Sequence, residues 1–172
     1  MKRIFPLLCS LLLSGCASVP EGVATVEGFD LARYLGTWHE IARLDHSFER
    51  GLVSVTAEYS LRTDGGVKVL NRGFDQAKNK WKEAEGRAYF TGSPSSGRLK
   101  VSFFRPFYGG YNIVELDKEA YSYSLVAGPD RSYLWILGRS PELPPAVLER
   151  LLARAQELGF DTSKLIYPGV KK

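Results

Sequence analysis

The feature that most constrains the fold is a series of eight segments in which apolar and polar residues alternate. A period of two is typical of a β-strand with one buried face. The segments span residues 37–43, 52–61, 67–74, 81–90, 98–104, 111–116, 121–127 and 133–139. Turn residues such as Asp64-Gly65 separate them, and the connections are short. Because parallel strands need long crossover connections, this pattern predicts antiparallel strands that are neighbours in chain order.

A helical period follows the last of these segments. Residues 144–159 repeat apolar side chains at helical spacing, begin with two prolines and end at Gly159, which are typical start and stop signals. Eight up-and-down strands hide their edges by closing on themselves, and they then enclose room for one small ligand. The predicted fold class is all-β: an eight-stranded antiparallel up-and-down β-barrel with one C-terminal α-helix packed outside. A two-sheet sandwich also satisfies the strand count.

The composition argues against several classes of function. The chain has 44% hydrophobic and 24% charged residues with a net charge of +4, and it lacks the basic stripe that nucleic-acid binding requires. The two histidines, His39 and His46, form no recognisable metal-ligand set, and no nucleophile-elbow motif accompanies them. We therefore expect a binding protein without nucleic-acid partner, catalytic residues, metal or cofactor.

The first residues indicate export and a lipid anchor. Lys2 and Arg3 precede a short apolar run, as in a secretory signal peptide. The segment Leu13-Ser14-Gly15-Cys16 resembles the bacterial lipobox, which implies cleavage before Cys16 and its acylation. Ala17 is not the aspartate that retains such lipoproteins at the inner membrane, so the implied location is the outer membrane with the domain in the periplasm. We expect a signal peptide at residues 1–15, a lipidated N-terminus and tether at 16–28, and the folded domain at 29–172.

Several segments resemble the lipocalin family, in particular its bacterial outer-membrane members. Gly36-Thr37-Trp38, residues 128–133 and Arg139 stand where lipocalins carry their three signatures, and further similar stretches extend the resemblance over residues 29–167. The resemblance implies a lipocalin calyx whose closed end is crossed by a helical turn at residues 31–34. Gly36 would let the backbone bend into the first strand. Trp38 would stack on Arg139 and close the barrel, which is a structural role without chemistry.

Alternation counted from Trp38 and Arg139 predicts an apolar and aromatic inner wall, the usual lining of a small-molecule pocket. The expected cavity residues are Glu40, Ala42, Val55, Ala57, Tyr59, Val69, Asn71, Ala88, Phe90, Val101, Phe103, Tyr111, Ile113, Leu125, Tyr133 and Trp135. The family resemblance implies fatty acids or lysophospholipids as ligands, stored or transported in the cell envelope, and a homodimer is compatible with it. The alternative is a non-catalytic structural lipoprotein of the envelope whose barrel is filled by side chains.

Overall fold

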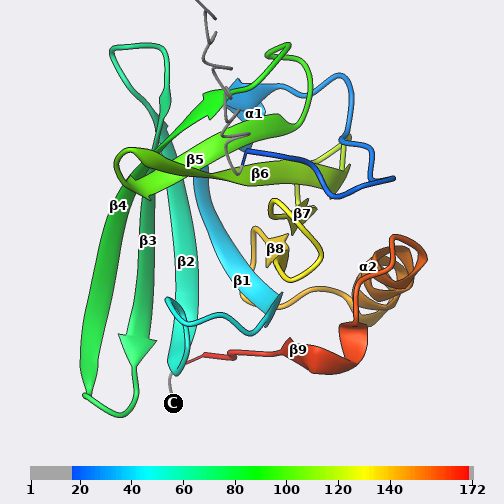
Figure 1. Cartoon of the computed structure of the whole chain (residues 1–172). Helices are drawn as coiled ribbons and strands as arrows, with labels where there is room; N and C mark the ends of the chain where they lie inside the picture. Colours follow the sequence, from blue (N-terminus) through cyan, green and yellow to red (C-terminus); the bar gives the residue numbers. More distant parts are fainter. Residues whose placement is uncertain (1–16, 171–172) are drawn as a thin grey trace, which may run out of the picture.

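The computed structural model describes residues 17–170, and these residues form a closed β-barrel with one helix outside it (Figure 1). The sheet order is β2-β3-β4-β5-β6-β7-β8-β1-β9, and an additional pairing of β1 with β2 closes the barrel. The strands are β1 (Gly36–Leu44), β2 (Leu52–Leu61), β3 (Val67–Asp75), β4 (Lys80–Phe90), β5 (Arg98–Phe104), β6 (Phe107–Leu116), β7 (Tyr123–Ala127), β8 (Leu134–Gly138) and β9 (Leu165–Ile166). The helical elements are α1 (Leu31–Tyr34), α2 (Pro145–Glu157) and the 3-10 turn η1 (Thr162–Lys164). The predicted fold class is confirmed.

Two strands differ from the sequence prediction by more than one residue at an end. The sequence predicts a turn over residues 106–110, but residues 107–110 belong to β6, where Gly110 pairs with Lys100. A Cβ at Gly110 would lie 2.4 Å from the carbonyl oxygen of Ser18, so this glycine serves a close backbone approach rather than a turn. The strand β7 starts at Tyr123 instead of residue 121, because Tyr121 has a φ of +53° and ends the preceding turn.

Buried side chains form two hydrophobic clusters, one on each face of the sheet. The inner cluster fills part of the barrel and includes Trp38, Tyr59 and Ile113. The outer cluster lies between the barrel and α2, where Leu151 and Ala155 of the helix are fully buried. Both faces of β7 and β8 are therefore covered over most of their length.

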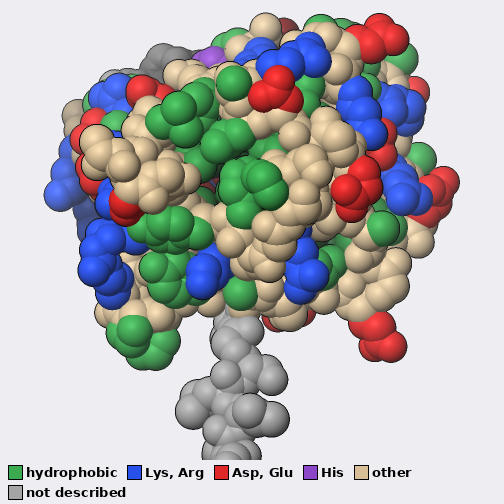
Figure 2. Space-filling model, turned by 90° about the horizontal axis from the view of Figure 1, so that it is seen from above, with side chains coloured by type: hydrophobic (Ala, Val, Ile, Leu, Met, Phe, Trp, Pro, Cys, Tyr) green, Lys and Arg blue, Asp and Glu red, His purple; other side chains and the backbone are tan. Residues whose placement is uncertain are grey.

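The antiparallel order assigns every connection to one of two ends. The β1–β2, β3–β4, β5–β6 and β7–β8 loops share one end, which we call the mouth. The short helix α1 and the β2–β3, β4–β5 and β6–β7 loops share the other end, which we call the floor. Seen from the floor end, which is the top of Figure 1, hydrophobic side chains gather around a shallow hollow and charged ones lie toward the edges (Figure 2). Within the described residues, no helix is both long and apolar enough to cross a membrane.

Candidate functional site: floor, wall and mouth of the barrel

The floor begins with the turn of helix α1. The Asp30 carboxylate caps this helix by accepting a hydrogen bond from the backbone N–H of Ala32 at 2.9 Å. The next bend is at Gly36, whose φ of +91° is rarely adopted by residues other than glycine. A Cβ at this position would also lie 3.4 Å from Nη1 of Arg139. Gly36 is therefore required for the bend into β1, whereas a Cβ there would only contact the arginine.

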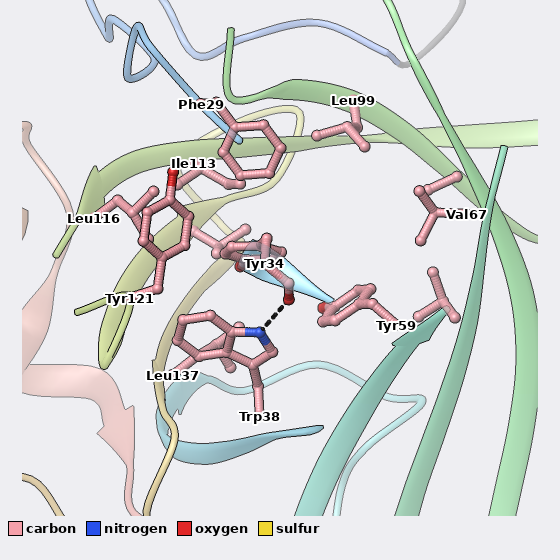
Figure 3. Packing of buried hydrophobic residues seen from close by; sticks show 13 residues of the cluster. Phe29, Tyr34, Trp38, Tyr59, Val67, Leu99, Ile113, Leu116, Tyr121 and Leu137 are labelled. Carbon is pink, nitrogen blue, oxygen red and sulfur yellow. Dashed lines mark hydrogen bonds between the residues drawn. The ribbon is translucent and has the colours of Figure 1, made fainter. Parts of the chain in front are cut away.

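Trp38 and Arg139 close the floor together. The guanidinium carbon of Arg139 lies 4.0 Å from the centroid of the Trp38 ring, and the indole is fully buried. The indole N–H donates to the carbonyl oxygen of Tyr34 at 2.8 Å (Figure 3). Arg139 donates to four backbone carbonyls, those of Arg33, Leu35, Thr37 and Tyr121. The stack expected from the sequence is present, and its charge is solvated by the backbone that crosses the barrel.

Three tyrosines lie directly above this plug. The hydroxyl of Tyr111 is 2.8 Å from those of Tyr34 and Tyr59, so the three groups satisfy one another in the interior. Burial raises the pKa of Tyr34 to about 12, which keeps it neutral. The remaining cavity beside them measures only about 10 Å³, which is room for about one water molecule. The half of the barrel next to the floor is therefore filled by side chains.

The half next to the mouth is more open. Of the predicted wall residues, Tyr59, Val69, Ala88 and Ile113 are buried in the inner cluster, whereas Ala57, Phe90, Val101, Phe103, Tyr111 and Trp135 pack against it and are only half-buried. Ala84, which shares the inner face of β4 with Ala88, is exposed. Among these half-buried side chains, Phe103 and Trp135 lie toward the mouth, whereas Ala57 pairs with Trp38 at the floor and Val101 and Tyr111 line the small cavity there.

Two predicted wall residues are wrong: Ala42 and Leu125 lie in the outer cluster, under α2. The register shift between Glu40 and Ala42 adds a residue to β1, so Ala42 turns outward and Arg43 turns inward opposite Trp135. For Leu125 the reason is different. All residues of β7 after Tyr123 are buried, so this strand offers no alternation from which its inner face can be read.

The remaining predicted wall residues lie toward the mouth. Val55 is buried, and its methyl group lies against Gly73 of the neighbouring strand. The Oδ1 atom of Asn71 is buried and has no hydrogen-bond partner. Tyr133 is half-buried and stacks on His46, with ring centroids 5.8 Å apart. Glu40 is buried and forms an ion pair with Arg43.

This ion pair belongs to a polar cluster that the sequence prediction missed. Arg43 is 1% exposed and donates from Nη1 to the Glu40 carboxylate and from Nη2 to the carbonyl oxygen of Glu49. The Glu49 carboxylate accepts a hydrogen bond from the indole N–H of Trp135 at 3.1 Å and lies 3.2 Å from Nε2 of His46. These contacts tie the β1–β2 loop to the barrel wall. The available signal was the i,i+3 spacing of Glu40 and Arg43. Residues at this spacing lie on opposite faces of a regular strand, so they can pair only if a bulge lies between them.

Burial controls the ionisation of this cluster. Burial raises the pKa of Glu40 above its usual range, and the nearby Glu49 charge adds to this effect while Arg43 opposes it. Burial also raises the pKa of Glu49. Burial lowers the pKa of His46 to about 4, and the Arg43 charge lowers it further. At neutral pH the imidazole is therefore uncharged, and the two carboxyl groups compete for one compensating charge.

A groove of about 550 Å³ lies beside the mouth. It is bordered by Arg43, residues 50–53 and the chain segment after β9. The strands β1 and β2 pair only from Gly36 to His39, so they diverge toward the mouth and leave this groove between them. No group of three His, Cys, Asp or Glu side chains suited to a metal ion occurs among residues 17–170. Cys16, the predicted lipidation site, lies outside the described residues.

Comparisons with known proteins agree with this architecture. A Lipocalin-like domain family model matches residues 29–169. The Outer membrane lipoprotein Blc of Vibrio cholerae is 56% identical over 167 residues, covering 97% of this chain and 98% of its own. The protein of the same name from Escherichia coli K12 is 53% identical over 171 residues, covering 96% of both chains.

Solved structures show the same fold at low sequence identity. The cockroach allergen Per a 4 has a TM-score of 0.69 at 19% identity and covers 90% of this chain and 96% of its own. Insecticyanin from the tobacco hornworm Manduca sexta has a TM-score of 0.69 at 20% identity, with 90% and 88% covered. With its sealed floor, its open mouth and a family match over most of its length, the chain belongs to the lipocalin family.

Proposed function

We propose that this lipocalin binds lipids in the cell envelope and is held at the outer membrane by an acylated Cys16, with its domain in the periplasm. Its ligands are fatty acids or lysophospholipids, which it stores or transports without catalysing a reaction. The relatives that share more than half of its residues carry the name outer membrane lipoprotein, which supports this location. The lipobox-like segment before Cys16 supports the anchor.

One observation carries the proposal of a lipid ligand. Val101, Phe103 and Trp135 face the barrel interior, are apolar or aromatic, and are still half-buried. An acyl chain that enters from the mouth would cover this surface, and each buried methylene contributes about 0.8 kcal/mol. After the costs of association are deducted, a chain of ordinary length still reaches micromolar affinity. The polar cluster of Glu40 and Arg43 lies on the mouth side of this surface, where the head group of such a ligand would be placed.

A fluorescence titration tests this proposal. Trp135 lies in the wall, so monomeric lysophospholipid or fatty acid should change the tryptophan emission saturably at one ligand per protein. A Trp135→Phe variant should lose most of the change, whereas Trp81→Phe, on the outer face of β4, should retain it. Mass spectrometry of lipid extracted from the purified protein identifies the ligand. Absence of both a saturable change and extracted lipid would contradict lipid binding.

A second candidate function rests on the filled half of the barrel. With only about 10 Å³ free beside Tyr34 and Tyr59, the protein is a rigid body near its floor. A structural lipoprotein of the envelope would need no more than this. Retention on envelope components without any lipid binding would favour that role. Light scattering of the purified protein tests the homodimer that the family resemblance suggests.

A further inference from the structure

We infer that the mouth of the barrel is a membrane-contact surface, and that the aromatic tips of its loops insert into the head-group region of a bilayer. The bilayer is the one that holds the acylated N-terminus, so the calyx opens toward the membrane that supplies or receives its ligand. The inference rests on the proposed acylation of Cys16. Four features support it: exposed rings at the mouth, a β1–β2 loop that is held in place, basic side chains at the mouth, and the position of the first described residues.

The first feature is the exposure of large rings at the loop tips. Phe104 and Phe107 pair across the tip of the β5–β6 connection and are 81% and 76% exposed. Phe48, in the β1–β2 loop, is 60% exposed. In the described part of the chain, Leu61 is the only large hydrophobic side chain at the floor that is exposed. Exposed apolar side chains such as Phe gain free energy when they are buried at the boundary between head groups and acyl chains, so this asymmetry favours the mouth as the contacting end.

The second feature is that the β1–β2 loop is held in place. The Phe48 ring stacks on His46 with centroids 3.9 Å apart, and His46 in turn stacks on Tyr133 of the wall. Arg43 and Trp135 fix the same loop through Glu49. Because the loop is already ordered, inserting Phe48 into lipid costs little conformational entropy.

The third feature is charge. The mouth carries Lys78, Lys80 and Arg105 as exposed cations. The acidic side chains at the mouth are Asp45, Glu49, Asp75 and Asp130; Asp45 and Asp75 are bridged by Arg50 and Lys82, and Glu49 is buried. Because Arg131 is exposed as well, the mouth has an excess of positive charge, which attracts anionic lipid head groups. At the floor, residues 30–35, 62–66, 91–97 and 117–122 carry four acidic side chains and, together with Arg139, four basic ones.

The fourth feature is where the chain enters the barrel. The hydroxyl of Ser18 donates to the carbonyl oxygen of Pro129 in the β7–β8 loop at 3.0 Å. Its carbonyl oxygen accepts from Nδ2 of Asn112 at 3.0 Å. Ser18 therefore lies against the outside of β6, next to the β7–β8 loop, at a level where Asn112 pairs with Arg98 of β5. Cys16 is two residues away, a span of at most about 7 Å. An acyl anchor at Cys16 would consequently hold this side of the barrel next to the bilayer, within reach of the β7–β8 loop of the mouth.

A probe at the two ends tests the orientation. Full-length protein is reconstituted in vesicles of phosphatidylethanolamine and phosphatidylglycerol that contain a spin-labelled quencher lipid. A fluorophore is attached to Phe107→Cys or, as the matched control, to the equally exposed Leu61→Cys at the floor. We expect emission from position 107 to shift to the blue and to be quenched, and position 61 to remain unchanged. Equal quenching at both positions, or quenching only at position 61, would overturn the inference.

A second measurement separates membrane contact from ligand binding. The Phe104→Ser/Phe107→Ser variant should take up fluorescent lysophospholipid from vesicles about three- to tenfold more slowly, because the encounter with the bilayer is weakened. Its equilibrium affinity for monomeric lysophospholipid should equal that of the native protein and of Leu61→Ser. An unchanged uptake rate would overturn the role of Phe104 and Phe107 in membrane contact. If the native protein bound no lysophospholipid while position 107 was still quenched, the proposed function would fail and the membrane contact would stand.

Discussion

The two ends of the barrel each pair an arginine with a tryptophan, but they solve different problems. At the floor, Arg139 covers Trp38 and donates to four backbone carbonyls. At the mouth, Arg43 lies opposite Trp135 and donates to the Glu40 carboxylate. It also donates to the backbone carbonyl of Glu49, whose own carboxylate lies in the same cluster. Backbone carbonyls do not titrate, whereas carboxyl groups do. The comparison teaches that the floor is built to stay closed over a wide pH range, while the mouth responds to its surroundings.

The same contrast separates stability from function. The floor is dry, filled and crossed by the chain, so changes there should reduce the free energy of unfolding. The mouth is half-buried and lined by groups with shifted pKa values, so changes there should alter ligand binding or pH dependence. Four predictions test this division. It would be contradicted if changes at the floor left stability unaltered, or if changes at the mouth altered neither ligand binding nor pH dependence.

The largest effect is expected for Trp38→Ala. The side chain is fully buried and donates to the Tyr34 carbonyl, so its loss leaves a cavity and an unpaired acceptor. The free energy of unfolding should fall by about 3–5 kcal/mol. Urea denaturation measures this change. Trp81→Ala, at a half-exposed ring outside the barrel, is the control and should lose no more than about 1 kcal/mol.

Arg139→Lys should cost less but still affect the floor. A lysine keeps the charge but lacks the planar fork that reaches the carbonyls of Arg33, Leu35 and Thr37 at once. We expect a loss of about 2–3 kcal/mol in the free energy of unfolding, since several carbonyls lose a charged donor at once. Arg50→Lys, whose arginine pairs with Asp45 at the surface, should be close to neutral. Equal losses in both variants would show that the floor has no special role.

A smaller effect is predicted for the pH dependence of the mouth. The pKa of Glu40 is raised in the folded state, so this carboxyl group lowers stability as the pH rises from the ordinary carboxyl range through the raised pKa. Glu40→Gln remains neutral and lacks this loss. The free energy of unfolding of the variant, relative to the native protein, should therefore increase by about 1–2 kcal/mol between pH 5 and pH 8.5.

His46 acts in the opposite direction in the same measurement. Its pKa is about 4 in the folded protein, below that of an unfolded histidine, so it lowers stability as the pH falls from about 6.5 toward 4. This contribution is common to both proteins and cancels in the difference. A difference between Glu40→Gln and native protein that stays flat with pH would show that Glu40 ionises normally.

The smallest effect is expected for filling the open half of the barrel. Ala84 is exposed on the inner face of β4, so Ala84→Phe should occupy space that the proposed acyl chain uses. Affinity for lysophospholipid should fall about tenfold, equivalent to about 1.4 kcal/mol, with little change in stability. Isothermal titration measures the affinity. Ala146→Phe, exposed on α2 outside the barrel, should bind as the native protein does.

The sequence by itself determined the number and order of the strands and the closure of the floor. The strands follow from period-two patterns separated by turn residues, and these signals are local. The contact of Trp38 with Arg139 and the bend at Gly36 were predicted from motifs in the first strand and directly after the eighth strand, through the resemblance to lipocalins. These features depend on residue type at fixed positions, which a sequence displays directly.

Only the tertiary structure decided which way side chains point at the mouth and how full the barrel is. One extra residue in β1 exchanged the faces of Ala42 and Arg43, because a bulge shifts every side chain beyond it. In β7, Leu125 and Val126 are both buried by different layers, so the sequence shows no alternation there. The Glu40–Arg43–Glu49 cluster required that bulge and a folded loop together. The direction of each side chain and the filling of the barrel interior depend on the register between strands and on the layer that covers each face of the sheet. Neither is a property of a single segment of sequence.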